Sequence, residues 1–335
     1  MLRGVLKRAA DMGFEVSAAA EFEFFVFEET PESVRGKNYR NLKTMTPGPF
    51  GYSILRAGVH SDYYRDLLAM CGAMDIPLEG LHTETGPGVL EAAIRYSGAL
   101  KAADRAALFK TFTKILSQKR GLMATFMAKW SRDWAGQSGH LHISLKDRAG
   151  KAVFHDAKAP GTISQTMRHF IGGQARLMPE LLAMVAPTVN SYSRLIPGFW
   201  APTAATWGIE NRTTALRAIP GGPSSQRVEY RVAAADINPY LALAAAIGSG
   251  LWGIEHKIDP GEPVKGNAYA AKLPRSAQFP RTLGEASEKF GRSKPARNLF
   301  GDAFVDHYAA TRMWEEREFR KAITDWELQR YLEII

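Results

Sequence analysis

Glutamates, histidines and arginines alternate with apolar residues in three short segments of the sequence. Because successive residues of a β-strand point to opposite faces, each segment is predicted to be a strand with one apolar face and one charged face. The strands are Ser17–Glu28, Leu141–Leu145 with the adjoining His140, and Arg227–Val232. Their charged faces carry Glu21 and Glu23 in the first strand, His140, His142 and Ser144 in the second, and Arg227, Glu229 and Arg231 in the third.

A fourth segment, HTETGPGVLE at 82–91, adds Glu84 and Glu91 on either side of a Gly-Pro-Gly turn. Two unit charges about 4 Å apart interact by about 4 kcal/mol at an effective dielectric constant of about 20, so converging carboxylates either take up protons or bind cations. Carboxylate oxygens favour Mg²⁺ or Mn²⁺, an imidazole is compatible with Mn²⁺, and nearby arginines suit a polyphosphate. Together these groups are the components of a phosphoryl-transfer site.

Each charged face also has a simpler interpretation, which is a half-solvated sheet surface. Exposed strand faces usually carry Thr, Lys and Ser, whereas these three carry carboxylates, imidazoles and guanidinium groups. The three faces taken together therefore favour a reactive site. Alternation within each strand does not show that the strands converge.

Composition indicates an ordinary globular protein of 335 residues, with 45% hydrophobic and 23% charged residues. The single cysteine, Cys71, excludes an internal disulfide framework and fits a reducing, cytoplasmic location.

The most apolar run, Leu241–Ile254, is shorter than the roughly 20 residues needed to span a bilayer and is predicted to be a buried helix, so we expect no membrane association. The net charge of +9 comes from scattered residues without a basic run or a nucleic-acid-binding motif, so nucleic acid is not the expected partner.

The remaining pattern predicts an α+β fold, a mainly antiparallel sheet flanked by helices, without a repeat or a domain boundary. A short strand is expected near 77–82. Long loops are expected at 30–51, 187–223 and 258–298. Helices are expected at 2–12, 63–74, 99–128, 162–184, 239–254 and 304–335.

Across nearly the whole chain, short motifs resemble those of the glutamine synthetase family and follow the family's order. They are AEFEFF (20–25), HTETGPGVLEAA (82–93), GQSGHLHISL (136–145), NSYSRLIPG (190–198), WGIENRTTALR (207–217), RVEYR (227–231) and NPYLALAAAI (238–247). The resemblance implies a glutamine synthetase-type catalytic domain over 1–335, with a curved, mainly antiparallel sheet. It also implies that ATP and two or more Mg²⁺ or Mn²⁺ ions are bound.

Carried over position by position, the resemblance implies roles for individual residues. One metal ion would be held by Glu23, Glu84 and Glu91, and the other by Glu21, His140 and Glu229. The nucleotide would be contacted by Glu79, His142, Ser144, Arg212, Arg217 and Arg227. Glutamate would be bound by Arg194, Arg231 and Gly136, with Arg212 and Arg231 as the catalytic arginines and Trp200 beside the amine.

The implied reaction has two steps. ATP phosphorylates the glutamate side-chain carboxylate, because a free carboxylate is a poor acyl donor, and an amine then displaces phosphate to give a γ-glutamyl amide. The expected partners are thus small molecules: glutamate or a close analogue, an amine and ATP.

The sequence departs from the family pattern at the position expected to meet the amine. Glutamine synthetases place a glutamate after the R-L-x-P-G run, and this chain has Trp200 there. An indole takes up no proton but can wall an apolar pocket or stack on an alkylammonium, which favours an alkylamine over ammonia. Val89 replaces a common glutamine, and Ser224 stands where a lysine is often found.

Family members also begin with a β-grasp domain of roughly a hundred residues, whereas this sequence starts just before the first catalytic strand. In the family that domain completes the neighbouring subunit's site within a double ring. The expected homo-oligomer and full activity are therefore both in question for this chain.

Other interpretations stay open at this stage. They are an ammonia-using glutamine synthetase, an inactive truncated relative and a guanidino-type phosphotransferase. The phosphotransferase would need a reactive cysteine in its site, and Cys71, in an apolar helix, does not fit that role. Tyr269 falls near a tyrosine that some bacterial members adenylylate, but its flanking residues do not match that site.

Overall fold

The computed structural model describes residues 1–335 and is built on one nine-stranded sheet. Along the main path the strand order is β2-β3-β1-β6-β9-β8-β7, and β4 and β5 pair with the ends of β1. All pairings are antiparallel except that of β7 with β8. The strands are β1 (Phe14–Phe27), β2 (Leu78–Thr83), β3 (Val89–Ile94), β4 (Ser97–Gly98), β5 (Met123–Thr125), β6 (Gly139–Asp147), β7 (Trp207–Ile209), β8 (Leu216–Ile219) and β9 (Arg227–Tyr230).

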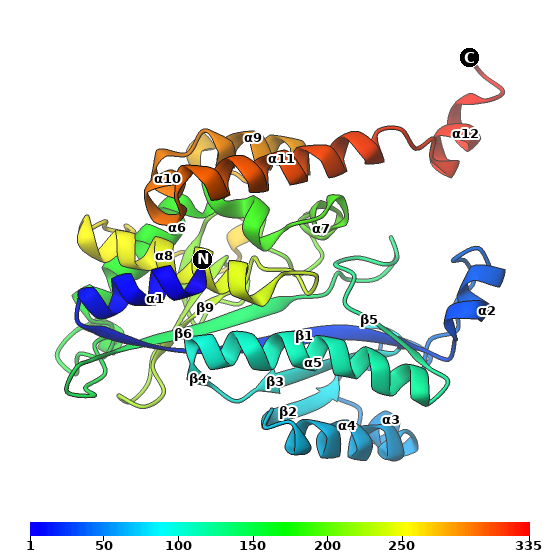
Figure 1. Cartoon of the computed structure of the whole chain (residues 1–335), viewed down its shortest axis with the longest axis horizontal. Coiled ribbons are helices and arrows are strands. Elements are labelled where there is room, and N and C mark those ends of the chain that lie inside the picture. The colour runs from blue at the N-terminus through cyan, green and yellow to red at the C-terminus, as the bar shows by residue number, and fades with distance from the viewer.

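Helices cover one face of this sheet in two layers (Figure 1). The inner layer packs on the long strand β1 and on itself, and a second layer lies above α6. The inner helices are α1 (Leu2–Asp11), α5 (Ala99–Lys119), α6 (Gln165–Val185) and α8 (Pro239–Glu255). The outer helices are α9 (Leu283–Gly291), α10 (Lys294–Phe300) and α11 (Asp302–Phe319). Shorter or peripheral helices are α2 (Pro31–Gly36), α3 (Ile54–Val59), α4 (Ser61–Ala73), α7 (Val189–Arg194) and α12 (Asp325–Tyr331).

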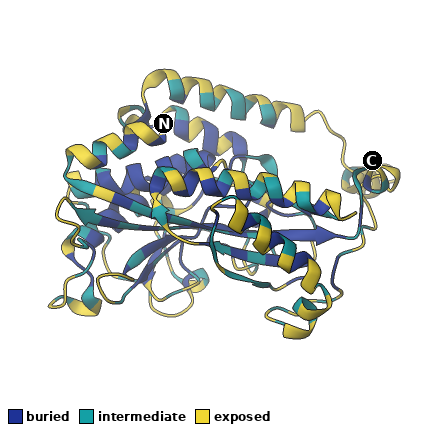
Figure 2. Ribbon diagram, turned by 60° about the horizontal axis from the view of Figure 1, so that its bottom comes forward, coloured by how far each residue is buried: buried dark blue, intermediate teal, exposed yellow.

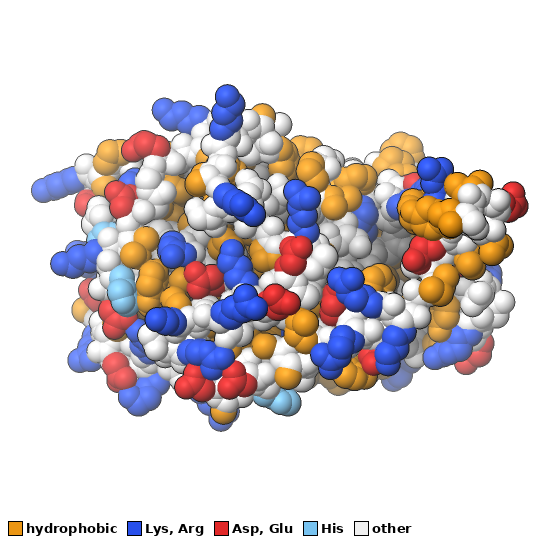
Figure 3. Space-filling view, turned by 90° about the horizontal axis from the view of Figure 1, so that it is seen from above, with side chains coloured by type: hydrophobic (Ala, Val, Ile, Leu, Met, Phe, Trp, Pro, Cys, Tyr) orange, Lys and Arg blue, Asp and Glu red, His pale blue; other side chains and the backbone are white.

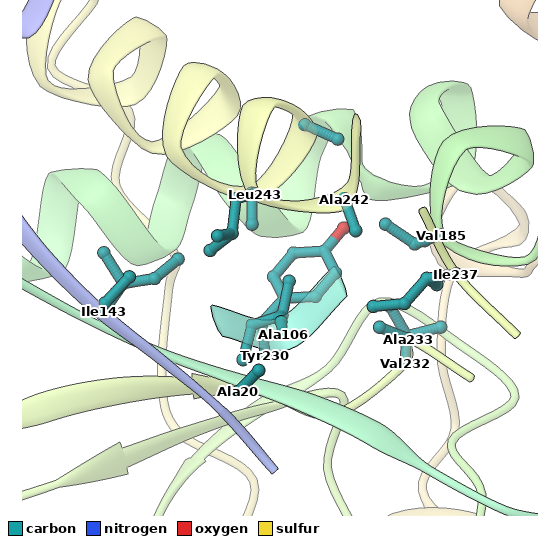
Figure 4. Packing of buried hydrophobic residues seen from close by; sticks show 14 of the residues in the cluster. Ala20, Ala106, Ile143, Val185, Tyr230, Val232, Ala233, Ile237, Ala242 and Leu243 are labelled. Carbon is teal, nitrogen blue, oxygen red and sulfur yellow. The ribbon is translucent and has the colours of Figure 1, made fainter. Parts of the chain in front are cut away.

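The apolar faces of the strands form the core beneath these helices. Tyr230 of β9 is fully buried among Ile143, Ala106 and Leu243, which come from β6, α5 and α8 (Figure 4). The dark-blue stretches along the sheet and the inner helices in Figure 2 mark this buried layer. The core thus fixes which face of β1, β6 and β9 is left for polar side chains.

Close helix packing above the sheet depends on small residues. A Cβ on Gly173 of α6 would lie 2.4 Å from the Cα of Gly253 in α8, so the two helices approach at a point where neither can carry a side chain. At its start α8 is capped by the Asn238 side chain, which accepts the amides of Tyr240 and Leu241.

The expected α+β class and the three charged strands are confirmed, with differences at several boundaries. The helix expected at 99–128 ends at Lys119, because Gly121 adopts φ 68° and the chain then pairs with β1 as β5. The loop expected at 187–223 contains α7, β7 and β8, and the loop expected at 258–298 contains α9 and most of α10. These elements have three to nine residues, too few to display a clear period.

The charged side chains on the surface are scattered, as expected from the sequence. Seen from above, basic and acidic side chains intermingle over the helical face (Figure 3). None of the helices combines the length and the apolar character required to cross a bilayer.

Candidate active site

Strand register gathers the predicted charged residues on one face of the sheet, in a diagonal band of three neighbouring register positions that we call the row. Glu21 of β1 is opposite His140 of β6, and His142 of β6 is opposite Glu229 of β9. The row extends on one side to Arg217 of β8, which is opposite Glu229. On the other side, Glu23 of β1 is opposite Glu91 of β3, and Glu91 is opposite His82 of β2.

This row forms the floor of a cavity of about 740 Å³. The cavity holds both predicted carboxylate groups, the predicted arginines, Gly136 and Trp200, so residues more than 200 positions apart in the sequence meet there. The predicted residues that line it are Glu21, Glu23, Glu84, Glu91, Gly136, His140, His142, Arg194, Trp200, Arg212, Arg217, Arg227, Glu229 and Arg231.

A second cavity of about 310 Å³ adjoins the first and shares Glu21, His142 and Arg227 with it. It contains the two remaining predicted residues, Glu79 and Ser144. The cavity borders β1 at Ser17–Ala20, where the side chains of Ser17 and Ala19, on the same face as Glu21, are small, while Ala18 and Ala20 point into the core. The predicted nucleotide residues therefore bridge the two cavities.

One group of donors at the centre of the row suits a divalent cation. Ligand atoms of Glu21, His142 and Glu229 lie within 4.8 Å of one another. The resemblance had placed His140, not His142, in this group. His140 Nδ1 lies 3.1 Å from Glu21 Oε1 and 3.3 Å from Glu229 Oε1, so both imidazoles adjoin the same two carboxylates. Burial, together with the nearby Arg231, lowers the pKa of His140, which leaves a neutral imidazole with a free lone pair.

A second group of carboxylates lies on the β3 side of the row. Burial raises the pKa of both Glu23 and Glu91, and Glu84 Oε2 is a buried oxygen without a hydrogen-bond partner. Glu23 also accepts the backbone amide of Ser138 at 2.8 Å. Closely packed, desolvated carboxylates with an orphaned oxygen fit a bound cation.

His82 and Tyr52 belong to this second group, although the sequence had not singled them out. His82 Nε2 is 3.3 Å from Glu91 Oε1, and this hydrogen bond raises the pKa of His82 to about 9. The Tyr52 ring packs on His82 with centroids 4.9 Å apart, and burial and Glu84 raise the pKa of Tyr52 to about 12. His82 opens the HTETGPG motif and could have been noticed, whereas Tyr52 follows a loop without any periodic signal.

Three arginines lie in or beside the row. Arg217 Nη1 donates to Glu229 Oε2 at 3.1 Å, and Arg231 donates to the other oxygen of Glu229. Arg194 is buried at the end of α7, donates to the carbonyls of Val232 and Arg231 at 2.9 and 3.2 Å, and has its pKa lowered to about 10 by burial. These fixed cations give the cavity a positive wall suited to carboxylates and phosphates.

A turn that we call the flap, residues 195–203, borders one end of the cavity. It contains Phe199 and Trp200, and both line the cavity together with Phe25, Tyr52 and Val89. Trp200 has φ 57°, a left-handed conformation that costs a non-glycine residue about 1–2 kcal/mol. The flap therefore presents an aromatic wall and no carboxylate at this end.

With this geometry in place, comparison with known proteins identifies the family. Residues 1–331 match the model of the glutamine synthetase catalytic domain. The chain belongs to the glutamine synthetase family. The ligase class expected from the sequence is thus confirmed at the level of the family, and the catalytic-domain fold is confirmed as well.

Relatives within the family differ in the amine that their names specify. Over its whole length the chain is 45% identical to type-1 glutamine synthetase 2 of Dictyostelium discoideum and spans 64% of that protein. It is 39% identical to a glutamate–isopropylamine ligase of Pseudomonas sp. over its whole length and 73% of the relative. A solved GmaS/ADP complex superposes with a TM-score of 0.88 at 29% identity, covering 99% of this chain and 76% of that one.

Two other predictions concern residues outside the cavity. Cys71 is buried in α4, its pKa is raised to about 11 by burial, and it lines neither cavity, as expected for a structural thiol rather than a nucleophile. The Tyr269 hydroxyl is buried and has no hydrogen-bond partner, so it is not presented to solvent for modification.

Proposed function

We propose that this chain is an ATP-dependent ligase that joins the side-chain carboxylate of glutamate to an alkylamine. The observation that carries the choice of amine is the aromatic wall at the flap, where Trp200 and Phe199 face the cavity with Val89 and no carboxylate stands on the flap. An alkyl substituent gains from contact with such a wall, whereas ammonium gains little.

In the proposed reaction, arginines first bind the two substrates. Arg194 and Arg231 bind the substrate's carboxylates, and Arg212 and Arg217 bind the ATP phosphates. A glutamate γ-carboxylate oxygen attacks the γ-phosphorus of ATP, the bond to the bridging oxygen breaks and ADP leaves. Arg212 stabilises the charge that develops on the transferred phosphoryl group.

The alkylammonium first loses a proton to solvent, and the free amine nitrogen then attacks the acyl carbon of γ-glutamyl phosphate. The bond from this carbon to the phosphate oxygen breaks, and the remaining extra proton on nitrogen leaves with the product as hydrogen phosphate. Closure of the flap over the cavity excludes water, which would otherwise hydrolyse the acyl phosphate. Two divalent cations, held by Glu21, His140 or His142, and Glu229 on one side and by Glu23, Glu84 and Glu91 on the other, would neutralise the phosphate oxygens when bound.

A second candidate is an ammonia-using glutamine synthetase. It is favoured by the 45% identity to a protein named as a glutamine synthetase. The two candidates share the first reaction step and differ in the second, so the amine preference separates them.

The test measures the rate at which the purified chain releases phosphate from ATP in the presence of Mn²⁺ and glutamate. The rate is compared between ammonium, methylamine, ethylamine and isopropylamine. We expect an alkylamine to stimulate release more than ammonium does, with γ-glutamyl alkylamide as the product by mass spectrometry. Glu229→Ala should abolish release, and Glu262→Ala, an exposed residue outside both cavities, should not. Stimulation by ammonium alone would identify the ammonia-using enzyme instead.

A further inference from the structure

Lys129 is a buried lysine outside the sequence motifs and outside both cavities. Only 7% of the residue is exposed, and no carboxylate lies within ion-pair distance of its ammonium group. The Nζ atom donates to the backbone carbonyl of Trp134 at 2.6 Å. An ammonium group with one hydrogen bond and no counter-ion is costly to bury, so another contact must offset its lost hydration.

That contact is the aromatic ring of Phe199 on the flap. Lys129 Nζ lies 3.9 Å from the ring centroid, well within the roughly 6 Å range of a cation–π interaction. No other charged group lies over this ring, and no other aromatic ring packs against it. The contact therefore joins the Lys129 ammonium group to the flap.

The backbone of Lys129 is fixed to the helix that precedes the flap. Its amide donates to Asn190 Oδ1 and its carbonyl accepts from Asn190 Nδ2, both at 2.8 Å. Asn190 belongs to α7, which carries Arg194 and leads into the flap. Lys129 is thus held by α7 through its backbone and reaches across to Phe199 through its side chain.

Lys129 also lies in the loop, residues 126–138, that leads to the carboxylate row. That loop contains Gly136, which packs against Arg194, and Ser138, whose amide donates to Glu23. Two of the loops that border the cavity, the one that contains Lys129 and Gly136 and the flap, are therefore connected through Lys129 and Phe199.

We propose that Lys129 is a positioning residue that holds the flap closed through Phe199, and thereby protects γ-glutamyl phosphate from water while the amine reacts. This inference rests on the proposed ligase function. An open flap would let water attack the acyl carbon, which returns glutamate and phosphate and consumes ATP without forming the amide. The side chain of Lys129 touches no substrate and acts only through the flap.

The test compares three variants. Lys129→Met keeps most of the aliphatic stem and removes the charge, Phe199→Leu removes the ring, and Lys129→Arg keeps a cation. The first readout is phosphate released per γ-glutamyl amide formed at saturating amine. Loss of a cation–π contact should raise this ratio roughly fivefold in Lys129→Met and Phe199→Leu, with Lys129→Arg near the unmodified chain. The double variant should show no further increase.

The second readout needs no activity. Hydrogen exchange of the backbone amides in 195–203 should become faster in Lys129→Met and Phe199→Leu and should recover in Lys129→Arg. Unchanged exchange would overturn the proposal, and so would faster exchange with an unchanged ratio. Failure of the unmodified chain to form any amide would refute the proposed function, while the exchange data would still decide whether Lys129 holds the flap.

Discussion

Glu23 and Glu91 lie directly opposite each other on the neighbouring strands β1 and β3. Opposed like charges destabilise a sheet, and burial raises the pKa of both groups. A cation bound between β1 and β3, or a proton on one of the two carboxylates, would relieve this repulsion and stabilise the sheet.

The first prediction concerns that cation. Mn²⁺ at about 100 times its dissociation constant should stabilise the protein by about 2.7 kcal/mol, measured as a rise in Tm by calorimetry. Glu23→Gln still accepts the Ser138 amide but weakens the cation site, so the rise should be largely lost. Glu15→Gln, on the same strand at an exposed position outside the cavity, is the matched control. If Mn²⁺ raised the Tm of Glu23→Gln as much as that of the unmodified chain, Glu23 would not be a ligand of the cation.

The second prediction concerns the loop beside Arg194. A Cβ on Gly136 would lie 2.6 Å from Arg194 Cγ and 2.7 Å from the carbonyl oxygen of Ala128. Gly136→Ala should therefore destabilise the fold by about 1–3 kcal/mol and raise the KM for glutamate, because Arg194 must move. Denaturant unfolding and steady-state kinetics measure the two effects.

The control for that substitution is Gly72→Ala on α4, where a Cβ meets nothing within 4 Å. Helix propensity should make this variant up to about 1 kcal/mol more stable. Equal effects of the two substitutions would mean that the packing of Gly136 on Arg194 is unimportant.

The third prediction concerns the amine. Trp200→Glu places a carboxylate on the flap, which should attract ammonium and remove the apolar contact, so the ratio of kcat/KM for ethylamine to that for ammonium should fall about tenfold. Trp326→Glu, an exposed tryptophan on α12 outside the cavity, should leave the ratio unchanged. A ratio that is the same in both variants would remove Trp200 from amine selection.

The fourth prediction concerns pH and a carboxylate far from the cavity. The side chain of Glu29 is buried beside Lys37, and its hydrogen bonds from Lys37, Ser33 and the Lys43 amide lower its pKa to about 2. Because the folded-state pKa lies below the unfolded value of about 4.3, this stabilisation is present above that value and is lost as pH falls toward 2.

Glu29→Gln should therefore lower the free energy of unfolding at pH 7 by about 1–3 kcal/mol and have a much smaller effect near pH 2. Chemical denaturation at the two pH values is the measurement. Glu262→Gln, an exposed residue without an ion pair, should change neither value. An equal loss for Glu29→Gln at both pH values would show that packing, not charge, makes Glu29 stabilising.

Local patterns in the sequence were sufficient for much of this structure. Alternation places Glu21 with Glu23, His140 with His142 and Arg227 with Glu229 on polar strand faces, because a strand has a period of two residues whatever its neighbours are. The helices α1 and α6 follow from apolar periodicity, and α8 follows from an almost uninterrupted apolar run.

Only the tertiary structure decided which of these groups meet. The register that sets Glu21 against His140 and His142 against Glu229 joins segments more than 80 residues apart, and alternation specifies the face of a strand but not its partner. The same limit applies to Arg217, which reaches the row on a four-residue strand, and to Lys129, whose pairing with Phe199 depends on two loops without a period. The sequence by itself therefore determined the chemical groups and their faces, while packing of the helices over the shared core determined their distances.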